Sequence, residues 1–161
     1  MSKPSSGAQL IPDTSIEQQS APAPLLVESI MTSPVFSIST DDTVREAIKK
    51  LLSKKIAGAP VIDSTRKVMS VVSEGDLLRL AATMGLDRTV FQCMIKLTKT
   101  EKLITIQRTD TFAEVYKKFL AHPVHRLIVV DDMGRLDGIV SRSNVLRVLV
   151  DANQETKSDK K

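Results

Sequence analysis

The segment Asp42-Thr43-Val44-Arg45-Glu46 decides the fold, because it recurs 68 residues later as Asp110-Thr111-Phe112-Ala113-Glu114. The same shift, without a gap, places Val72-Ser73 on Val140-Ser141. A repeat unit of this size that cannot bury its own apolar face completes its core on its neighbour. The sequence therefore predicts two similar halves that pack together, with function at the seam between them.

Each copy predicts the same series of elements. Thr43 is followed three residues later by Glu46, and Thr111 by Glu114, which is the pattern of a capping box at the start of a helix. The elements expected in the first copy are a strand at 35–39, a helix from Thr43, strands at 59–63 and 68–72, and a helix from Ser73. The second copy repeats them 68 residues later, at 103–107, from Thr111, at 127–131 and 136–140, and from Ser141. This order, β-α-β-β-α twice, predicts an α+β fold of two tandem repeats packed with pseudo-two-fold symmetry.

The ends of the chain differ in composition from its centre. Residues 1–24 are rich in Ser, Pro and Gln, and residues 151–161 are polar and charged, so both are expected to be disordered tails. The 42% hydrophobic content of the 161 residues suffices for one compact body. We expect the first repeat at 25–86 and the second at 87–150.

Composition also narrows the location and the partners. No apolar run approaches the ~20 residues of a membrane span, and the N-terminus has no secretory signal pattern. The single cysteine, Cys93, allows no intrachain disulfide, which fits a reducing cytoplasm. A pI near 9.3 favours nucleic-acid binding, but 3% aromatic content and interspersed acids count against that class.

Catalysis fits the sequence poorly. A glycine-rich phosphate loop ending in Gly-Lys is absent, and the two histidines do not have metal-ligand spacing. Ser73 and Ser141 lack the flanking glycines of a hydrolase nucleophile. We therefore expect no enzyme activity, no catalytic residues, no metal and no cofactor.

Five segments resemble the cystathionine β-synthase (CBS) domain, which occurs as tandem pairs in regulatory Bateman modules. Residues 27–32 (VESIMT) resemble its opening segment, 58–63 (GAPVID) its central strand, and 72–78 (VSEGDLL) its closing strand-to-helix motif. The second copy supplies 124–131 (VHRLIVVD) and 138–146 (GIVSRSNVL). The resemblance covers nearly all of the chain from Val27 to Val150 and implies adenosine-type ligands in clefts between the repeats.

The first expected cleft, site A, combines a ribose acceptor with phosphate donors. By the resemblance, Asp76 holds the ribose hydroxyls beside Ser73, while His125 and Arg126 of the other repeat face it and bind phosphate. The Ser-x-x-Asp pattern is also an ordinary helix cap with a first-turn acid, and the local string alone favours that interpretation, but the adjoining half-site with His125 and Arg126 favours ribose binding. The residues expected in site A are Ser73, Asp76, Ile104, Val124, His125 and Arg126.

The second expected cleft, site B, has the same construction with weaker groups. Asn144 replaces the ribose acid, and Ala57-Gly58 stands where His125-Arg126 stands in the other copy, so the cleft lacks a phosphate cation. Arg142 is a candidate to compensate. The residues expected in site B are Thr32, Phe36, Ile56, Ala57, Ser141, Arg142 and Asn144.

The sequence thus predicts a stand-alone regulatory module that binds an adenine nucleotide, AMP first, with ADP and ATP next. Nothing in it resembles an effector domain, so the signal should pass to a separate, unidentified protein partner, and the family implies a homodimer formed through helices. Two alternatives stay open: a dimerisation scaffold with vestigial sites, and a sensor of S-adenosylmethionine, NAD or a cyclic dinucleotide.

Overall fold

The computed structural model describes residues 23–97 and 103–158. The expected N-terminal tail lies outside these residues except for its last two positions. The first part of the chain contains α1 (Val27–Ile30), β1 (Ile38–Ser39), α2 (Val44–Lys54), β2 (Gly58–Ile62), β3 (Val68–Ser73), α3 (Glu74–Met84) and α4 (Val90–Leu97). The second part contains β4 (Thr105–Ile106), α5 (Phe112–Ala121), β5 (Arg126–Val130), β6 (Leu136–Ser141) and α6 (Arg142–Ser158).

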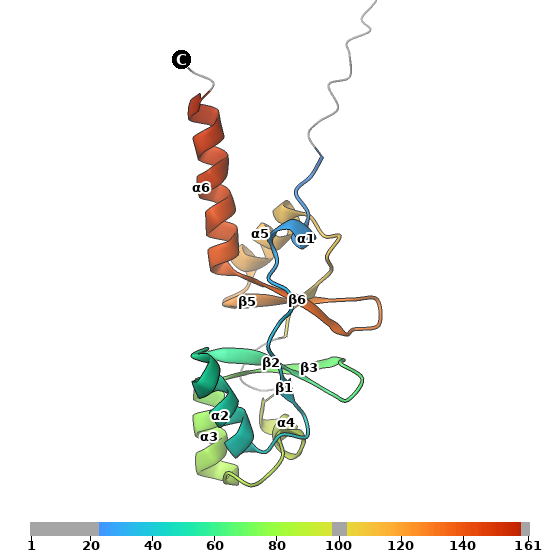
Figure 1. Cartoon of the computed structure of the whole chain (residues 1–161), viewed down its shortest axis with the longest axis vertical. Helices are drawn as coiled ribbons and strands as arrows, with labels where there is room; N and C mark the ends of the chain where they lie inside the picture. The colour runs from blue at the N-terminus through green and yellow to red at the C-terminus, as the bar shows by residue number, and fades with distance from the viewer. Residues whose placement is uncertain (1–22, 98–102, 159–161) are drawn as a thin grey trace, which may run out of the picture.

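Two three-stranded sheets face each other in the middle of the molecule, and the helices cover their outer faces (Figure 1). The strand orders are β1-β2-β3 and β4-β5-β6, each with one parallel and one antiparallel pairing. Gly58 pairs with Ser73 and Arg126 pairs with Ser141, so the two sheets keep the same register. The predicted β-α-β-β-α repeat is confirmed, although β1 and β4 span two residues each instead of the five expected.

The predicted capping boxes start their helices. The Thr43 hydroxyl accepts the Glu46 backbone N–H, and the Glu46 carboxylate accepts the Thr43 backbone N–H at 2.7 Å. Thr111 and Glu114 repeat the arrangement at α5. Each box satisfies helix N–H groups that lack an intrahelical partner, which explains why both helices begin where the repeat predicts.

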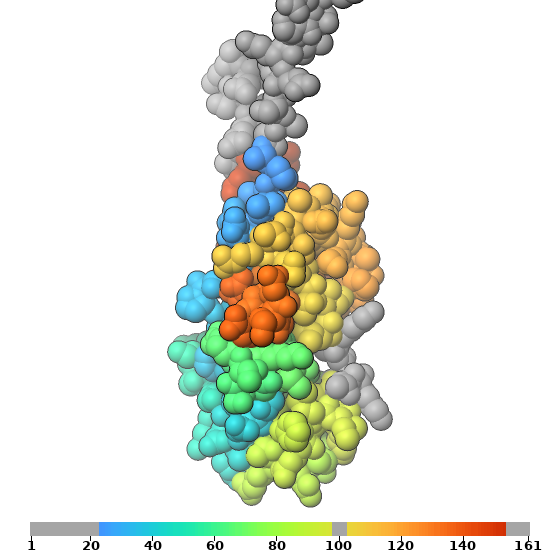
Figure 2. All heavy atoms as spheres, turned by 90° about the vertical axis from the view of Figure 1, so that its right-hand side faces the viewer, coloured from blue at the N-terminus to red at the C-terminus, as the bar shows by residue number. Residues whose placement is uncertain are grey.

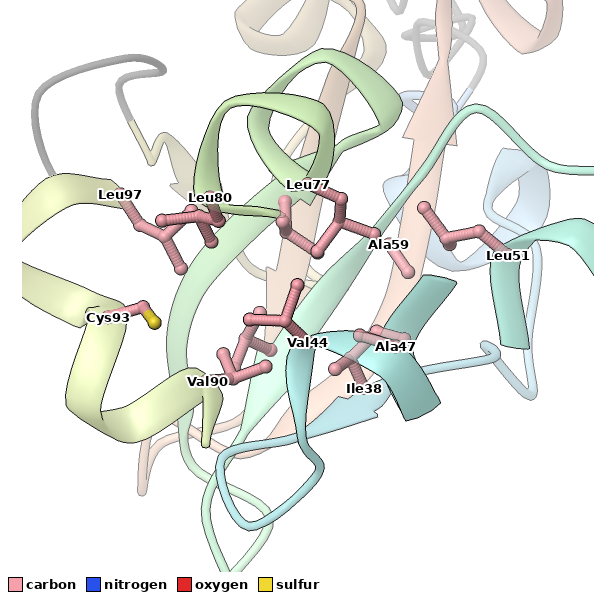
Figure 3. Packing of buried hydrophobic residues seen from close by; sticks show 12 residues of the cluster. Ile38, Val44, Ala47, Leu51, Ala59, Leu77, Leu80, Val90, Cys93 and Leu97 are labelled. Carbon is pink, nitrogen blue, oxygen red and sulfur yellow. The ribbon is translucent and has the colours of Figure 1, made fainter. Parts of the chain in front are cut away.

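Two helices that the repeat pattern did not predict complete the cores. Val90, Cys93 and Leu97 of α4 are buried against α2 and α3 of the first repeat (Figure 3). Burial raises the pKa of the Cys93 thiol. Val27 of α1 is buried in the core of the second repeat, beside Ile106 and Val115. The first repeat is therefore completed by α4, which precedes the second repeat in the chain, and the second repeat by α1, which precedes the first. Helix α4 lies after the expected boundary at 86/87 but packs in the core of the first repeat.

A third core fills the seam between the two sheets. Val68, Val71, Ile128 and Leu136 are buried there. The hairpin turns also pair: the Val68 N–H donates to the Gly134 carbonyl and the Leu136 N–H to the Arg66 carbonyl, both at 3.0 Å. Figure 2 shows the β5–β6 hairpin, in orange, lying directly against the first repeat in green. The seam is thus a packed and hydrogen-bonded interface, which holds the cavities beside it in place.

The C-terminal prediction needs correction. The expected disordered tail begins at residue 151, but α6 runs from Arg142 through Ser158. Polar composition does not exclude a helix whose first turns are anchored by packing, as Val145 and Leu149 are here. Among the described residues, no helix is long and apolar enough to cross a membrane.

Candidate functional site

The Arg126 side chain extends across the seam to Gly58, the residue at the equivalent position of the first repeat. Its guanidinium Nη1 donates a 2.7 Å hydrogen bond to the carbonyl oxygen of Gly58, 68 residues earlier. A Cβ atom at Gly58 would lie 2.8 Å from the Val72 carbonyl oxygen and 3.3 Å from Arg126 Nη1. The missing side chain at Gly58 therefore makes the room into which Arg126 extends.

Cavity A lies on the α3 side of this contact and has a volume of about 390 Å³. Its wall consists of residues 71–75, at the end of β3 and the start of α3, together with Ala57, Gly58, His125 and Arg126. The first turn of α3 points backbone N–H groups and a partial positive charge toward its N-terminal end. Cavity A therefore combines a helix N-terminus from one repeat with a cation from the other.

Cavity B has a volume of about 330 Å³ and contains the same four residues, Ala57, Gly58, His125 and Arg126. The rest of its wall comes from both repeats: Thr32, Pro34, Val35, Phe36, Ile56, Pro60, Ile139 and Ser141. Ile139 and Ser141 are the repeat counterparts of Val71 and Ser73 in cavity A. The cavities are thus related by the pseudo-two-fold symmetry and meet at Arg126, and both volumes fall within the range of about 300–1,000 Å³ of small-molecule sites.

Half of the residues predicted for site A line cavity A. Ser73, His125 and Arg126 do so. Val124 is instead buried at 4% exposure in the second core, and Ile104 packs against that core. Asp76 is 3% exposed and does not contribute to the cavity wall. The expectation that Asp76 faces His125 and Arg126 across an open cleft is therefore not met.

The Asp76 carboxylate is committed to the helix start. Its Oδ2 accepts the Ser73 backbone N–H at 2.9 Å and the Ser73 hydroxyl at 2.8 Å, which completes a capping box. Its Oδ1 accepts Arg79 Nη2 at 3.0 Å. The Arg79 side chain is 65% exposed, so this ion pair is screened by water and contributes at most ~1 kcal/mol. The cap interpretation of Ser-x-x-Asp is confirmed, and Oδ1 is the atom that a ribose hydroxyl would compete for.

Five of the seven residues predicted for site B line cavity B: Thr32, Phe36, Ile56, Ala57 and Ser141. Arg142 is exposed and Asn144 is half-buried, and neither contributes to the wall. Asn144 Oδ1 accepts the Ser141 backbone N–H at 2.8 Å, as Asp76 does for Ser73. The amide therefore takes over the capping role of the carboxylate.

One predicted difference between the clefts is wrong. Site B was expected to lack a phosphate cation because Ala57-Gly58 replaces His125-Arg126, but His125 and Arg126 line cavity B as well as cavity A. The sequence comparison missed this because it assigned each dipeptide to one cleft, whereas the seam brings both dipeptides to the shared wall. Ala57 likewise lines both cavities.

Two charged residues near the cavities were not predicted. Glu74, at the first position of α3, lines cavity A, whereas its repeat counterpart Arg142 does not line cavity B. The Lys54 ammonium lies 5.7 Å from the centre of the Phe36 ring, which is a cation–π contact beside cavity B. The aligned repeats already show this difference, because Glu74 of the first copy aligns with Arg142 of the second. No cluster of three or more His, Cys, Asp or Glu that could hold a metal ion occurs within residues 23–97 and 103–158.

A family model described as the CBS domain matches the chain twice, at residues 27–83 and 95–151. The chain is 29% identical over 126 residues to 5'-AMP-activated protein kinase subunit gamma of Dictyostelium discoideum, covering 72% of this chain and 22% of that protein. It is 31% identical over 108 residues to the subunit gamma-3 of Sus scrofa, covering 65% and 21% respectively. The chain thus spans about a fifth of the length of these relatives.

Solved structures show the same architecture. CBSX2 in complex with AMP superposes with a TM-score of 0.66 at 27% identity, covering 80% of this chain and 98% of that one. The CBS domain pair of MJ0100, solved with 5'-methylthioadenosine and S-adenosyl-L-methionine, gives a TM-score of 0.65 at 22% identity over 80% of this chain and 98% of that one, and shows the shared fold. With two matched repeats, two equivalent sheets and paired cavities at the seam, the chain belongs to the CBS domain family as a tandem CBS pair.

Proposed function

We propose that this CBS pair is a regulatory module that binds an adenine nucleotide, AMP first, in the cavities at the seam. The observation that carries the proposal is the position of Arg126, which lines both cavities and bridges the repeats through its hydrogen bond to Gly58. The 27% identity to CBSX2, a protein solved with AMP, and the match to AMP-activated kinase gamma subunits support the choice of ligand.

The phosphate is assigned to Arg126 and His125. A guanidinium offers a planar fork of donors that matches phosphate oxygens, and an imidazole adds one or two more. His125 is exposed and Arg126 is half-buried, so both can reach a ligand while Arg126 retains its bond to Gly58. The N-termini of α3 and α6, where Ser73 and Ser141 line the cavities, add backbone dipoles that favour an anion.

The adenosine part is assigned to the apolar walls. Phe36 and Ile56 offer a flat ring and an aliphatic surface in cavity B, and Val71 and Val72 line cavity A. Ribose hydroxyls are assigned to Asp76 Oδ1, which does not line cavity A and is reached from it only in competition with Arg79. This competition makes ribose binding weaker than a free carboxylate would allow.

We assign the outer helices to contacts with other proteins, through which the signal is passed on. Leu52 and Leu78 of the first repeat are 66% and 74% exposed, and their repeat counterparts Leu120 and Leu146 are 73% and 60% exposed. An apolar groove of about 330 Å³ lies between α2 and α3 beside Leu52 and Leu78. We assign this face, repeated on α5 and α6, to homodimerisation, which leaves the remaining surface for a separate regulated protein.

A stability screen tests the function. The unfolding temperature is measured with AMP, ADP, ATP, adenosine, S-adenosylmethionine, NAD and cyclic di-AMP. A ligand that binds the native state alone raises the free energy of unfolding by ~2.7 kcal/mol at a hundredfold excess over its Kd. We expect the largest shift with AMP. A larger shift with another adenosyl compound reassigns the ligand, and no shift with any compound identifies a scaffold with vestigial sites.

A further inference from the structure

The two cavities have a single set of phosphate-binding groups between them. Arg126 and His125 line both, and they meet Ala57 and Gly58 at the wall that separates the cavities. Within residues 23–97 and 103–158, no other Lys or Arg lines either cavity. A guanidinium that grips a phosphate in one cavity is therefore withdrawn from the other.

Charge makes simultaneous use of both cavities unfavourable. A phosphomonoester carries about −1.5 to −2 charge at neutral pH, by analogy with phosphorylated side chains. Two of them on either side of Arg126 would bring roughly three to four negative charges against one guanidinium. Like charges that share a site repel, and in a partly buried site this repulsion is less screened than in bulk water.

Glu74 then decides which cavity is used. Glu74 lines cavity A, where its negative charge opposes a phosphate, and as the first residue of α3 it also offsets the positive end of the helix. Cavity B contains no acidic residue among its described lining residues. Arg142, the counterpart of Glu74, stands at the same position of α6. The helix N-terminus near cavity B therefore keeps its full attraction for an anion.

We propose that each chain binds one phosphorylated nucleoside at a time, in cavity B, because the cavities share Arg126 and Glu74 disfavours phosphate in cavity A. This inference rests on the proposed function and adds to it the number of ligands and their place. It reverses the expectation from the sequence that the Asp76 cleft is the tighter one. A phosphate bound in one cavity thereby reduces the positive charge that is available in the other cavity.

Isothermal titration calorimetry of the full chain with AMP tests the inference through its stoichiometry. We expect one AMP per chain in the wild type, with any second AMP bound at least about tenfold more weakly. In Glu74→Arg, which places in cavity A the residue type found at position 142, we expect two AMP per chain. A gain of a site requires a folded protein, so this outcome cannot arise from damage to the fold.

The control is Asp41→Arg, which makes the same change of charge at an exposed residue that lines neither cavity. It should keep one AMP per chain. Two equal sites in the wild type overturn the inference and leave the proposed function intact. An unchanged single site in Glu74→Arg overturns the role of Glu74. A single site that becomes tighter in Glu74→Gln, which removes the negative charge without adding a cation, places AMP in cavity A and overturns the cavity assignment. No AMP binding by the wild type refutes the proposed function itself.

Discussion

Arg126 and Gly58 occupy equivalent positions in the two repeats, and the side chain of one donates a hydrogen bond to the backbone of the other. The distance from Arg126 Nη1 to the Gly58 carbonyl oxygen is 2.7 Å. In a symmetric pair both positions would carry the same residue, and two arginines would compete for the same space. Because the first repeat has glycine at this position, the seam is asymmetric there, and the single guanidinium of Arg126 serves both cavities.

The space at Gly58 predicts the effect of a methyl group. Gly58→Ala places a Cβ atom 2.8 Å from the Val72 carbonyl oxygen, so the β2–β3 pair or Arg126 must move. We expect a loss of ~1–3 kcal/mol in the free energy of unfolding, the usual cost of overpacking, measured by urea denaturation. Gly75→Ala is the matched control, since its Cβ meets its nearest atoms, on the side chains of Ser73 and Arg79, at 3.7 Å. Equal stability of Gly58→Ala and the wild type would show that the seam is looser than the structure has it.

The ion pair between Arg79 and Asp76 predicts a gain of affinity on deletion. Arg79→Ala removes the Arg79 side chain as a competitor for Asp76 Oδ1, while the capping bonds of Oδ2 to Ser73 remain. Adenosine should then bind up to about fivefold more tightly, because an exposed pair contributes at most ~1 kcal/mol. Calorimetry with adenosine measures this, since that ligand has no phosphate for Arg79 to attract. An unchanged or weaker affinity would limit Asp76 to its role as a helix cap.

The exposed leucines on the outer helices predict the oligomeric state. The double variant Leu78→Asp with Leu146→Asp places two charges on the proposed dimer face, where burying them without partners is costly. We expect the wild type to sediment as a dimer and this variant as a monomer in analytical ultracentrifugation. Phe91→Asp is the control, because Phe91 is 64% exposed on α4, away from the α2–α3 groove. A wild-type monomer, or a dimer that survives both substitutions, would contradict the assignment.

The turn carboxylates predict how stability changes with pH. Hydrogen bonds lower the pKa of Asp63, chiefly from the Thr65 hydroxyl, and that of its counterpart Asp131, chiefly from the Arg135 backbone N–H. A lowered folded pKa gives stability that is present above the unfolded value of ~3.9 and is lost as the pH falls through the folded values. The double variant Asp63→Asn with Asp131→Asn should therefore lose less unfolding free energy than the wild type from pH 5 to pH 3, measured by urea denaturation. Parallel losses would exclude these carboxylates as contributors.

Local signals in the sequence predicted most of the fold. Capping pairs such as Thr43 with Glu46 act within one turn, and strand patterns act within a few residues, so they can be read without tertiary information. The same signal was present at α4, where Thr89 and Gln92 exchange backbone-to-side-chain hydrogen bonds, but it lies outside the repeated pattern and was missed. The length of α6 was missed because its later turns carry no apolar periodicity.

The site was harder to predict because it depends on how the two sheets meet. The exchange of α1 and α4 between the cores, and the shared position of His125 and Arg126, follow from contacts between segments far apart in the chain. Residue types at the repeat positions indicated which groups lie near the seam. They did not indicate that one dipeptide serves both cavities, or that Asp76 is turned into its own helix cap.

The most direct test of the central claim compares AMP with adenosine in Arg126→Gln. Glutamine keeps an N–H donor for the Gly58 carbonyl but removes the positive charge, and Arg45→Gln, which lines neither cavity, serves as the control. By calorimetry, Arg126→Gln should weaken AMP roughly ten- to hundredfold, the ~1.5–3 kcal/mol of a hydrogen bond to a charged group, and leave adenosine nearly unchanged. An equal loss of affinity for both ligands, or no loss for AMP, would contradict the assignment of phosphate to Arg126.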